Sequence, residues 1–190
     1  MQFYQEITLL QNPEISFGAL WAKVYRELHL ELAKLSDANG CTPVGVSFPE
    51  YGDEKFCLGQ KLRLFARDEA DLSTLNLKVT LRRFDDYIHI TRVRPVPSVT
   101  QYAIYSRWHQ ANNAEQKARR YARRHNVEYT EAKKLFSRQE FSPALPYINM
   151  GSRSNGQFFR LYISQRTADA PYYAGFSAYG LSGESTVPIF

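Results

Sequence analysis

The 190-residue sequence contains few of the residues that build disulfide frameworks or thiolate metal sites. Cys41 and Cys57 are the only cysteines, and neither belongs to a CxxC pair. This scarcity argues against a disulfide-rich secreted domain and fits a reducing cytoplasm. No apolar run reaches the roughly 18 residues that a membrane span needs. The N-terminal region carries Glu6, Glu14 and Glu27 instead of a basic start and an apolar stretch, so we expect no secretory signal and a cytoplasmic location.

The motifs of several enzyme classes are also missing. His29, His89, His109 and His125 are the only histidines, and none of them forms an HxxxH or HExxH pattern. The sequence also lacks a GxxxxGK[ST] phosphate loop and a GxSxG elbow. These gaps argue against a histidine-based metal site, nucleotide-triphosphate hydrolysis and hydrolase-type nucleophilic catalysis. We therefore expect neither a metal nor a cofactor.

Positive charge is concentrated in the second half of the chain. Residues 1–100 hold 12 Lys and Arg against 13 Asp and Glu, whereas residues 101–190 hold 12 against 6. The net charge is therefore −1 in the first part and +6 in the second. A concentrated field of one sign attracts a polyanion. Nucleic acid is the expected partner, because no Trp-anchored amphipathic helix accompanies the basic run to suggest a membrane surface.

With 44% hydrophobic and 14% aromatic residues, the chain has enough apolar surface for an ordered protein. The apolar periodicity of the first half predicts the order strand, helix, strand, strand, helix, strand, which is the ferredoxin-like pattern of an α+β fold. The expected strands span 2–10, 44–49, 60–66 and 86–94, and the expected helices span 17–36, capped by Ser16, and 68–75. Pro95 and Pro97 interrupt the last strand, so we place a domain at 1–94 and a linker at 95–100.

The remaining residues, 101–190, are expected to form a smaller α+β domain. Residues 101–108 are expected to be extended, and 112–126 to form a helix capped by Asn112 or Asn113. A second helical piece is expected over 130–136. Strands are expected at 157–164 and in the final stretch up to Phe190.

The helix expected at 112–126 carries the densest cluster of positive charge. Lys117, Arg120 and Arg124 share one face by helical spacing, and Arg119 and Arg123 lie beside them. Like charges this close repel one another, which implies a compensating anion. Guanidinium groups bind phosphate, or the O6/N7 edge of guanine, with two hydrogen bonds. A solvated charged helix face is the alternative. The uneven charge of the two halves favours nucleic acid, although the helix alone does not separate RNA from DNA.

An enzyme that cuts RNA needs no metal, because RNA carries its own nucleophile. The 2′-OH attacks the adjacent phosphate when a base removes its proton, an acid protonates the leaving 5′-oxygen and the ribose is held for in-line attack. Imidazole suits either proton transfer near neutral pH. His29 falls late on the expected first helix, off its apolar stripe, where a histidine is more often a surface or capping residue. Composition and spacing alone therefore do not identify a catalyst.

Several segments together resemble one family in their order and spacing. The segments are ELHLEL (27–32), GVSFP (45–49), LGQKLRL (58–64), ARRH (122–125), SRSNGQFFRLYI (152–163) and FSAYGLS with the closing VP (176–188). Through them the whole chain resembles the type I-F CRISPR-associated endoribonuclease, which cuts precursor CRISPR RNA within its repeats.

The resemblance implies a ferredoxin-like N-terminal domain and a C-terminal domain with the arginine helix. It also implies metal-independent cleavage at the 3′ base of a repeat hairpin, which leaves a 2′,3′-cyclic phosphate and a 5′-hydroxyl. The enzyme is then expected to stay on the mature CRISPR RNA as a subunit of the RNA-guided surveillance complex, so the implied partners are the hairpin RNA and the other subunits.

The resemblance also assigns roles to individual residues by motif. His29 would be the catalytic histidine, Ser152 would hold the ribose and its 2′-OH, and Tyr179 would orient the histidine. Phe159 would stack on the closing base pair of the stem, and Arg107 would read a guanine near the cleavage site. The other expected RNA contacts are His109, Asn112, Lys117, Arg119, Arg120, Arg123, Arg124 and Ser154, among which Arg120 and Arg124 would enter the groove of the stem.

Two departures from the family pattern affect the expected RNA. His109 stands where a glutamine that reads an adenine is expected, which leaves the base preference beside the stem open. Because of Ala118 and Ala122, the arginine helix carries fewer cations than the family pattern has. The bound RNA is therefore expected to differ in its stem sequence.

Two alternatives to a nuclease remain. The first is a hairpin-binding subunit that has lost cutting, against which the retained histidine, serine and tyrosine argue. The second is an unrelated RNA-binding module, because the ferredoxin-like fold hosts many functions. An RNA-recognition motif needs a pattern of aromatic residues on its central strands, and the expected strand at 60–66 lacks that pattern.

Overall fold

The computed structural model describes residues 1–52, 58–108, 114–136, 144–151 and 156–190. These residues form two compact units. Residues 1–107 and 145–190 build the first unit, which carries the sheets, and residues 108–144 build the second, which carries two helices.

The larger sheet of the first unit has five strands, and all of its pairs are antiparallel. Its order is β3-β4-β1-β5, with β6 also paired to β1. Apolar side chains of the two central strands, such as Ile7 and Leu64, are fully buried. The strands are β1 (Phe3–Leu9), β3 (Gly45–Ser47), β4 (Lys61–Ala66), β5 (Ile88–Ile90) and β6 (Arg94–Pro95).

A second sheet of the first unit comes from later in the chain and has the order β11-β7-β9-β8. Its strands are β7 (Tyr102–Trp108), β8 (Tyr147–Gly151), β9 (Phe158–Ala168) and β11 (Val187–Pro188). A two-stranded ladder joins β2 (Cys41–Thr42) to β10 (Phe176–Ser177). This ladder ties a segment near the end of the chain to one that follows the first helix.

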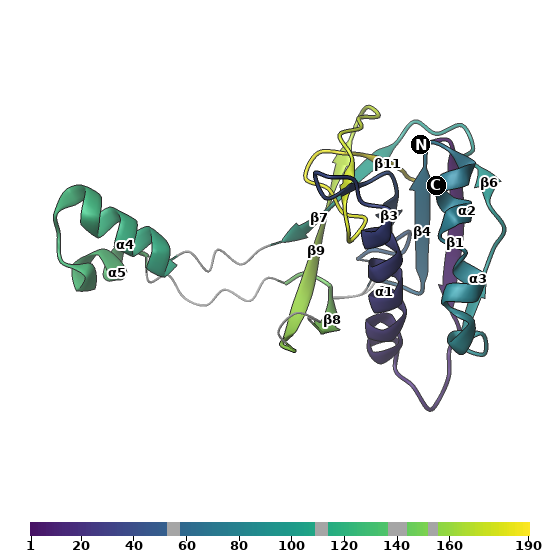
Figure 1. The fold of residues 1–190 in the computed structure, drawn as a ribbon, viewed down its shortest axis with the longest axis horizontal. Helices are drawn as coiled ribbons and strands as arrows, with labels where there is room; N and C mark the ends of the chain where they lie inside the picture. The colour runs from purple at the N-terminus through teal and green to yellow at the C-terminus, as the bar shows by residue number, and fades with distance from the viewer. Residues whose placement is uncertain (53–57, 109–113, 137–143, 152–155) are drawn as a thin grey trace. The chain divides into compact units, whose positions relative to one another are not determined.

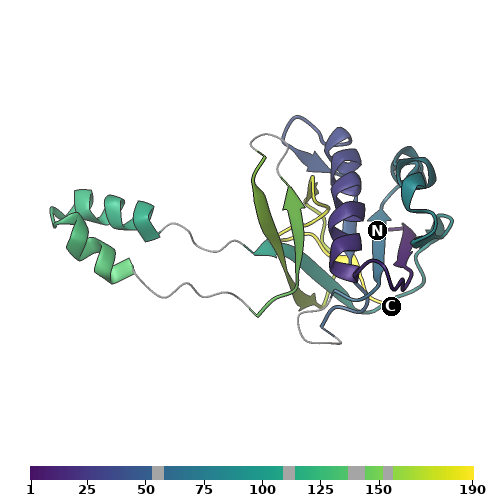
Figure 2. The same ribbon diagram turned by 90° about the horizontal axis from the view of Figure 1, so that it is seen from below.

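Helix α1 (Phe17–Lys34) is the longest helix of the first unit. The Ser16 hydroxyl accepts a hydrogen bond from the Ala19 amide at 3.4 Å, which caps the helix start. In Figures 1 and 2, α1 lies between the β8–β9 pair and strands β4 and β1. Its buried side chains recur at helical spacing: Leu20, Trp21, Val24, Tyr25, Leu28 and Leu32. The shorter helices α2 (Glu69–Thr74) and α3 (Leu77–Thr80) and the 3-10 turn η1 (Arg82–Phe84) follow β4.

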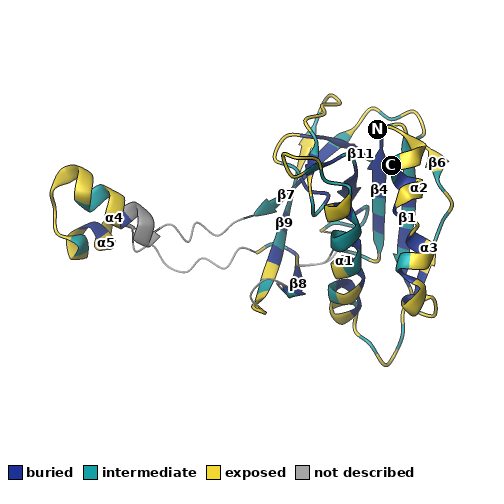
Figure 3. Cartoon of the chain, in the orientation of Figure 1, coloured by how far each residue is buried: buried dark blue, intermediate teal, exposed yellow. Residues whose placement is uncertain are grey.

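One hydrophobic core joins α1 to both larger sheets. The Phe48 ring, which follows β3, packs against Trp21 and Tyr25 of α1 and against Tyr105 of β7, with centroid separations of 5.8 to 6.2 Å. The Tyr105 hydroxyl donates to the Phe48 carbonyl oxygen at 3.0 Å. Figure 3 shows the buried residues gathered on the inner sides of these elements. This core fixes the position of α1 relative to β7 and β9.

The second unit contains helices α4 (Ala114–His125) and α5 (Tyr129–Phe136), which pack against each other. Ala118 and Ala132 are fully buried, because small side chains let the two helices approach closely. Asn126 adopts a left-handed backbone with φ +50° at the end of α4, and the Val127 amide donates to the Ala122 carbonyl oxygen at 3.2 Å. No helix in the described part of the chain is long and apolar enough to cross a membrane.

The predicted α+β class is confirmed. Strands β1 and β4 and helices α1, α2 and α5 lie close to their predicted limits, whereas the strand predicted at 86–94 is too long. Pairing with β1 covers 88–90, is interrupted at Thr91, whose hydroxyl accepts the hydrogen bond of the Glu6 amide, and resumes at Arg94 in β6. Strand β8 was not predicted. The ferredoxin-like topology and the domain limits at 1–94 and 101–190 stay predictions.

Gly180, in the turn after β10, is a position that no other residue suits. Its φ is +69°, and a Cβ there would lie 2.5 Å from Val46 Cγ1 in the core. We expect Gly180→Ala to lower the free energy of unfolding by about 2–4 kcal/mol, because backbone strain and overpacking act together. Urea unfolding followed by circular dichroism measures the loss.

Gly40→Ala is the matched control. Gly40 also has a positive φ, +76°, but a Cβ there would meet nothing within 4 Å. Its expected cost is therefore the strain alone, about 1 kcal/mol. Equal losses in the two variants would show that the contact with Val46 is unimportant.

Candidate active site

Four residues with predicted roles meet in the first unit, although they are far apart in the sequence. His29 comes from α1, Arg107 from the end of β7, Phe159 from β9, and Tyr179 from the turn after β10. All four side chains are half-buried. They are therefore held by the core but can still reach a ligand.

The His29 ring has a defined tautomer. Its Nδ1 lies 2.8 Å from the carbonyl oxygen of Ala178. Because a carbonyl oxygen only accepts hydrogen bonds, Nδ1 carries the proton and donates. In the neutral ring Nε2 therefore holds the lone pair, and this nitrogen can take up or deliver a proton. A backbone carbonyl that fixes the other ring nitrogen is a familiar way to prepare an imidazole for proton transfer.

The Tyr179 ring stacks on the His29 ring. The ring centroids are 4.1 Å apart and the planes differ by 2°. The stack restricts the tilt of the imidazole while the Ala178 carbonyl fixes its rotation. Tyr179 was expected to orient the histidine, and the observed contact is ring on ring.

Tyr25 supports this arrangement and was not predicted as a site residue. It lies four residues before His29, one helical turn away on the same side of α1. Its hydroxyl donates to the Tyr179 carbonyl oxygen at 2.7 Å. Burial raises the pKa of the Tyr25 phenol far above its ordinary value, so the hydroxyl stays a donor. Two side chains of α1 thus hold two consecutive carbonyls of the 177–181 turn.

Backbone hydrogen bonds anchor the same turn. The Ser177 amide and hydroxyl both donate to the Leu181 carbonyl oxygen at 2.8 Å, which closes the turn. The Val46 amide of β3 donates to the Gly180 carbonyl oxygen at 2.9 Å. The Ser182 amide donates to the Tyr105 carbonyl oxygen of β7, also at 2.9 Å. The turn that carries Tyr179 is therefore bound to both larger sheets.

Arg107 adds a positive charge to the assembly. Its guanidinium carbon lies 5.1 Å from the centre of the Phe159 ring and 5.3 Å from the centre of the Tyr179 ring. Cation–π contacts at such distances hold a guanidinium between aromatic rings and leave its N–H groups available to a ligand. The assembly therefore joins a proton-transfer group, a cation and an aromatic surface.

A groove of about 830 Å³ lies among α1, Arg83 of η1 and the β8–β9 pair, and none of the four side chains of the assembly lines it. Arg26, Leu30 and Lys34 of α1 line one side, and Gly151, Gly156 and Phe158 line the other. Arg26 precedes His29 by three residues and Leu30 follows it directly. The groove therefore runs along α1 from Arg26 to Lys34, and His29 itself does not line it.

Several predicted site residues lie outside the described part of the chain. They are His109, Asn112, Ser152 and Ser154. Ser152 follows Gly151, a lining residue of the groove, directly in the sequence. Lys117 belongs to α4, but its side chain is not among the described ones.

The four arginines of α4 are all exposed. By helical spacing, Arg120, Arg123 and Arg124 lie on the side opposite the buried Ala118, and Arg119 lies beside them. The guanidinium of Arg119 also contacts the Tyr129 ring at 5.8 Å. Burial of Ala118 against α5 explains why this position carries no cation.

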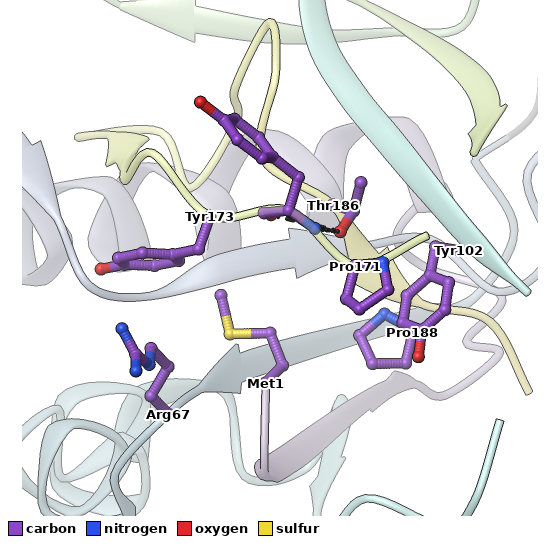
Figure 4. A pocket seen from close by; sticks show the side chains of 8 residues that line it. Met1, Arg67, Tyr102, Pro171, Tyr173, Thr186 and Pro188 are labelled. Carbon is purple, nitrogen blue, oxygen red and sulfur yellow. Dashed lines mark hydrogen bonds between the residues drawn. The ribbon is translucent and has the colours of Figure 1, made fainter. Parts of the chain in front are cut away.

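A second concavity, of about 120 Å³, does not include the assembly around His29. It lies among Met1, Arg67, Tyr102 and residues of two segments near the end of the chain (Figure 4). The Tyr172 amide donates to the Thr186 hydroxyl there at 2.8 Å. No predicted site residue lines it. Among the described residues, no group of three His, Cys, Asp or Glu side chains is placed to hold a metal ion.

Known proteins resemble this chain along its whole length. The family model for the CRISPR-associated protein Cas_Csy4 matches residues 4–190. The chain belongs to this family. The CRISPR-associated endonuclease Cas6/Csy4 of Pseudomonas aeruginosa strain UCBPP-PA14 is 33% identical over 195 residues, with both chains fully covered. The protein with the same name from Escherichia coli strain UTI89 / UPEC is 33% identical over 194 residues, again with full coverage. The predicted membership of the Cas_Csy4 family is thereby confirmed.

Loss of the Tyr25 hydroxyl is expected to weaken the hold on the 177–181 turn. Tyr25→Phe keeps the ring but leaves the Tyr179 carbonyl without this donor, so we expect the free energy of unfolding to fall by about 1–2 kcal/mol. Tyr172→Phe, at a largely exposed ring, is the control and is expected to change nothing. Urea unfolding of both variants tests the bond, and an unchanged stability in Tyr25→Phe would contradict its importance.

Proposed function

We propose that this protein is an endoribonuclease that processes precursor CRISPR RNA, cutting at the 3′ base of a repeat hairpin without a metal. The observation that carries the proposal is the fixed His29 ring, with Nδ1 bound to a carbonyl and Nε2 left for proton transfer. The names of two full-length relatives support it, because both are called CRISPR-associated endonucleases.

The proposed reaction uses the RNA's own 2′-OH as nucleophile. The 2′-oxygen bonds to the adjacent phosphorus, the bond from phosphorus to the 5′-oxygen breaks, and the products are a 2′,3′-cyclic phosphate and a 5′-hydroxyl. One proton leaves the 2′-OH and one is delivered to the 5′-oxygen. His29 Nε2 performs one of these transfers. Ser152 is proposed to hold the ribose for in-line attack, and Tyr179 to keep the imidazole in place.

The aromatic and cationic groups are proposed to position the hairpin. Phe159 would stack on the closing base pair, and Arg107 would read a guanine near the cut, which fits the contact between these two side chains. The exposed arginines of α4 would bind the groove of the stem. His109, Asn112, Lys117 and Ser154 are proposed as further RNA contacts. After cutting, the protein would stay on the mature RNA as a subunit of the surveillance complex.

His29→Ala is expected to abolish cutting and to leave hairpin affinity within a few-fold. The test incubates candidate repeat hairpins with protein in EDTA, maps the product ends and measures affinity separately. His89→Ala, at an exposed histidine of β5, is the control and is expected to cut normally.

Three results would contradict parts of this proposal. Full activity in His29→Ala would remove this residue from the mechanism. A 3′-hydroxyl product would point to a different reaction. Intact RNA that stays bound to the wild-type protein would leave the alternative of a non-catalytic hairpin-binding subunit.

Arg120→Ala or Arg124→Ala is expected to weaken hairpin binding by about 1–3 kcal/mol if the lost contact is bidentate. Arg82→Ala, an exposed arginine of η1, is the matched control and is expected to have no effect. Binding titrations over a range of salt concentrations separate bidentate contacts to bases from contacts to phosphates. A loss confined to the salt-sensitive, sequence-independent part of binding would reduce these arginines to phosphate contacts.

A further inference from the structure

The β-turn that carries Tyr179 is a closed unit. The Gly180 amide donates to the Ser177 carbonyl oxygen at 2.7 Å, which makes Tyr179 one of the two central residues of the turn. The peptide group that supplies this amide also presents its carbonyl oxygen to the Tyr25 hydroxyl, at 2.7 Å. One planar peptide group therefore closes the turn through its N–H and ties the closed turn to α1 through its C=O.

The Tyr25 hydroxyl gives the turn a reference point on α1 that does not depend on the imidazole. Beyond Tyr179, the Gly180 carbonyl oxygen and the Ser182 amide bond the turn to β3 and β7. Towards α1, the turn is bonded by the Tyr25 hydroxyl and by the His29 ring itself. The His29 ring is the group that has to be positioned, so its own bond cannot fix both its place and that of the turn. The independent reference is the bond from Tyr25, one helical turn away.

The Tyr25 side chain is fixed and remains a hydrogen-bond donor. It is fully buried, and its ring packs against Phe48 of the core with centroids 6.2 Å apart. Burial raises the pKa of its phenol far above the ordinary value, so the hydroxyl keeps its proton near neutral pH. The His29 ring, by contrast, is half-buried, and it is held by the Ala178 carbonyl and by the stack on Tyr179. The rigid side chain thus determines where the more exposed one finds its acceptor.

From this geometry we infer that Tyr25 is a positioning residue for RNA cutting, whose hydroxyl keeps His29 in the tautomer and orientation that leave Nε2 for proton transfer. The inference rests on the proposed function. Without the hydroxyl, the turn loses its reference on α1, and the stack and the bond to Ala178 both loosen. Nδ1 then has no fixed acceptor, so the neutral ring populates both tautomers. A ring with its proton on Nε2 cannot remove a proton there, and a rotated ring no longer meets the same oxygen. The chemical step therefore slows, while RNA binding does not weaken.

Tyr51 provides a matched control that packs against the same core. Its hydroxyl also donates to a backbone carbonyl oxygen, that of Ile163 in β9, at 2.9 Å. Its ring also packs against an aromatic residue, Tyr105, with centroids 6.0 Å apart. Tyr51→Phe therefore removes the same kind of bond but leaves the bonds between α1 and the turn in place. A loss of rate that comes from general destabilisation would appear in both variants.

The kinetic test measures two quantities at a temperature where circular dichroism shows every variant folded. One is the rate of a single turnover, with protein in excess over a repeat hairpin that the wild-type protein cuts. The other is the affinity for the same hairpin with a 2′-deoxy nucleotide at the cut. We expect Tyr25→Phe to lower the rate roughly ten- to hundredfold, the range that misplacement of a reacting group by about 1 Å reaches, and to leave the affinity unchanged. Tyr51→Phe is expected to cut at the wild-type rate. Tyr25→4-aminophenylalanine keeps an N–H donor at the same place and is expected to recover most of the rate.

Nitrogen-15 NMR of the His29 ring gives a readout that does not involve activity. At a pH where the ring is neutral, the protonated and the bare ring nitrogens resonate at well-separated frequencies, and the spectrum of His29→Ala identifies the signals. We expect a single tautomer with the proton on Nδ1 in the wild-type protein and in Tyr51→Phe. In Tyr25→Phe we expect a mixture of both tautomers.

Each outcome decides the inference. A wild-type cutting rate in Tyr25→Phe overturns it. An equal loss of rate in Tyr51→Phe also overturns it, because the effect would then be one of general stability. So does a single tautomer with the proton on Nδ1 in Tyr25→Phe, because the hydroxyl would then not govern the ring. If the wild-type protein cuts no repeat hairpin, the proposed function itself fails, and the NMR comparison still tests whether Tyr25 positions His29.

Discussion

Two hydrogen bonds from one side of α1 determine the geometry on which the candidate site depends. Tyr25 and His29 lie one helical turn apart and donate to the carbonyl oxygens of residues 179 and 178. The spacing of the donors is fixed by the helix, and the spacing of the acceptors is fixed by consecutive peptide groups. The imidazole and the turn that carries Tyr179 therefore hold each other. No further side chain is needed to position the imidazole relative to the turn. The arrangement requires only that α1 and the turn are both anchored in the core.

The core supplies that anchoring through aromatic residues. Phe48 joins Trp21 and Tyr25 of α1 to Tyr105 of β7, so the helix and the second sheet share one packed centre. Arg107 lies near the end of β7 in this sheet, and β9 places Phe159 beside it. Strand geometry divides the Phe158–Phe159 pair between two surfaces, because successive side chains point to opposite faces. Phe159 therefore contacts Arg107, whereas Phe158 lies exposed on the opposite face.

Periodicity predicted much of the fold because α1, β1 and β4 each bury one regular face. It failed where local hydrogen bonding overrides the pattern, as at Thr91, and where the elements are too short to show a period, as in β2, β10 and β11. The alternation of Ile148 and Met150 in β8 was visible in the sequence. Pro146 and Asn149, which are uncommon in strands, obscured it.

The site residues were predictable only in part. His29 and Tyr179 came from family motifs, because their partnership spans 150 residues of sequence and leaves no local signal. Tyr25 could have been found as the residue one turn before His29 on the same side of α1. The carbonyl of Ala178 could not, because every residue has one and only the turn at 177–181 directs this one at the imidazole.

The hydrogen bond to the Ala178 carbonyl leaves the imidazole only one nitrogen, Nε2, for proton transfer. Nδ1 is occupied, so only one nitrogen faces a substrate, and the ring cannot rotate without losing both this bond and the stack on Tyr179. Transfer of a phosphodiester to its own 2′-oxygen removes a proton at one oxygen and adds one at another on the far side of phosphorus. An imidazole in a fixed orientation can therefore exchange a proton with only one of these two oxygens. In the proposed reaction, the second proton must therefore travel through water or another group, or the RNA must shift between the two transfers.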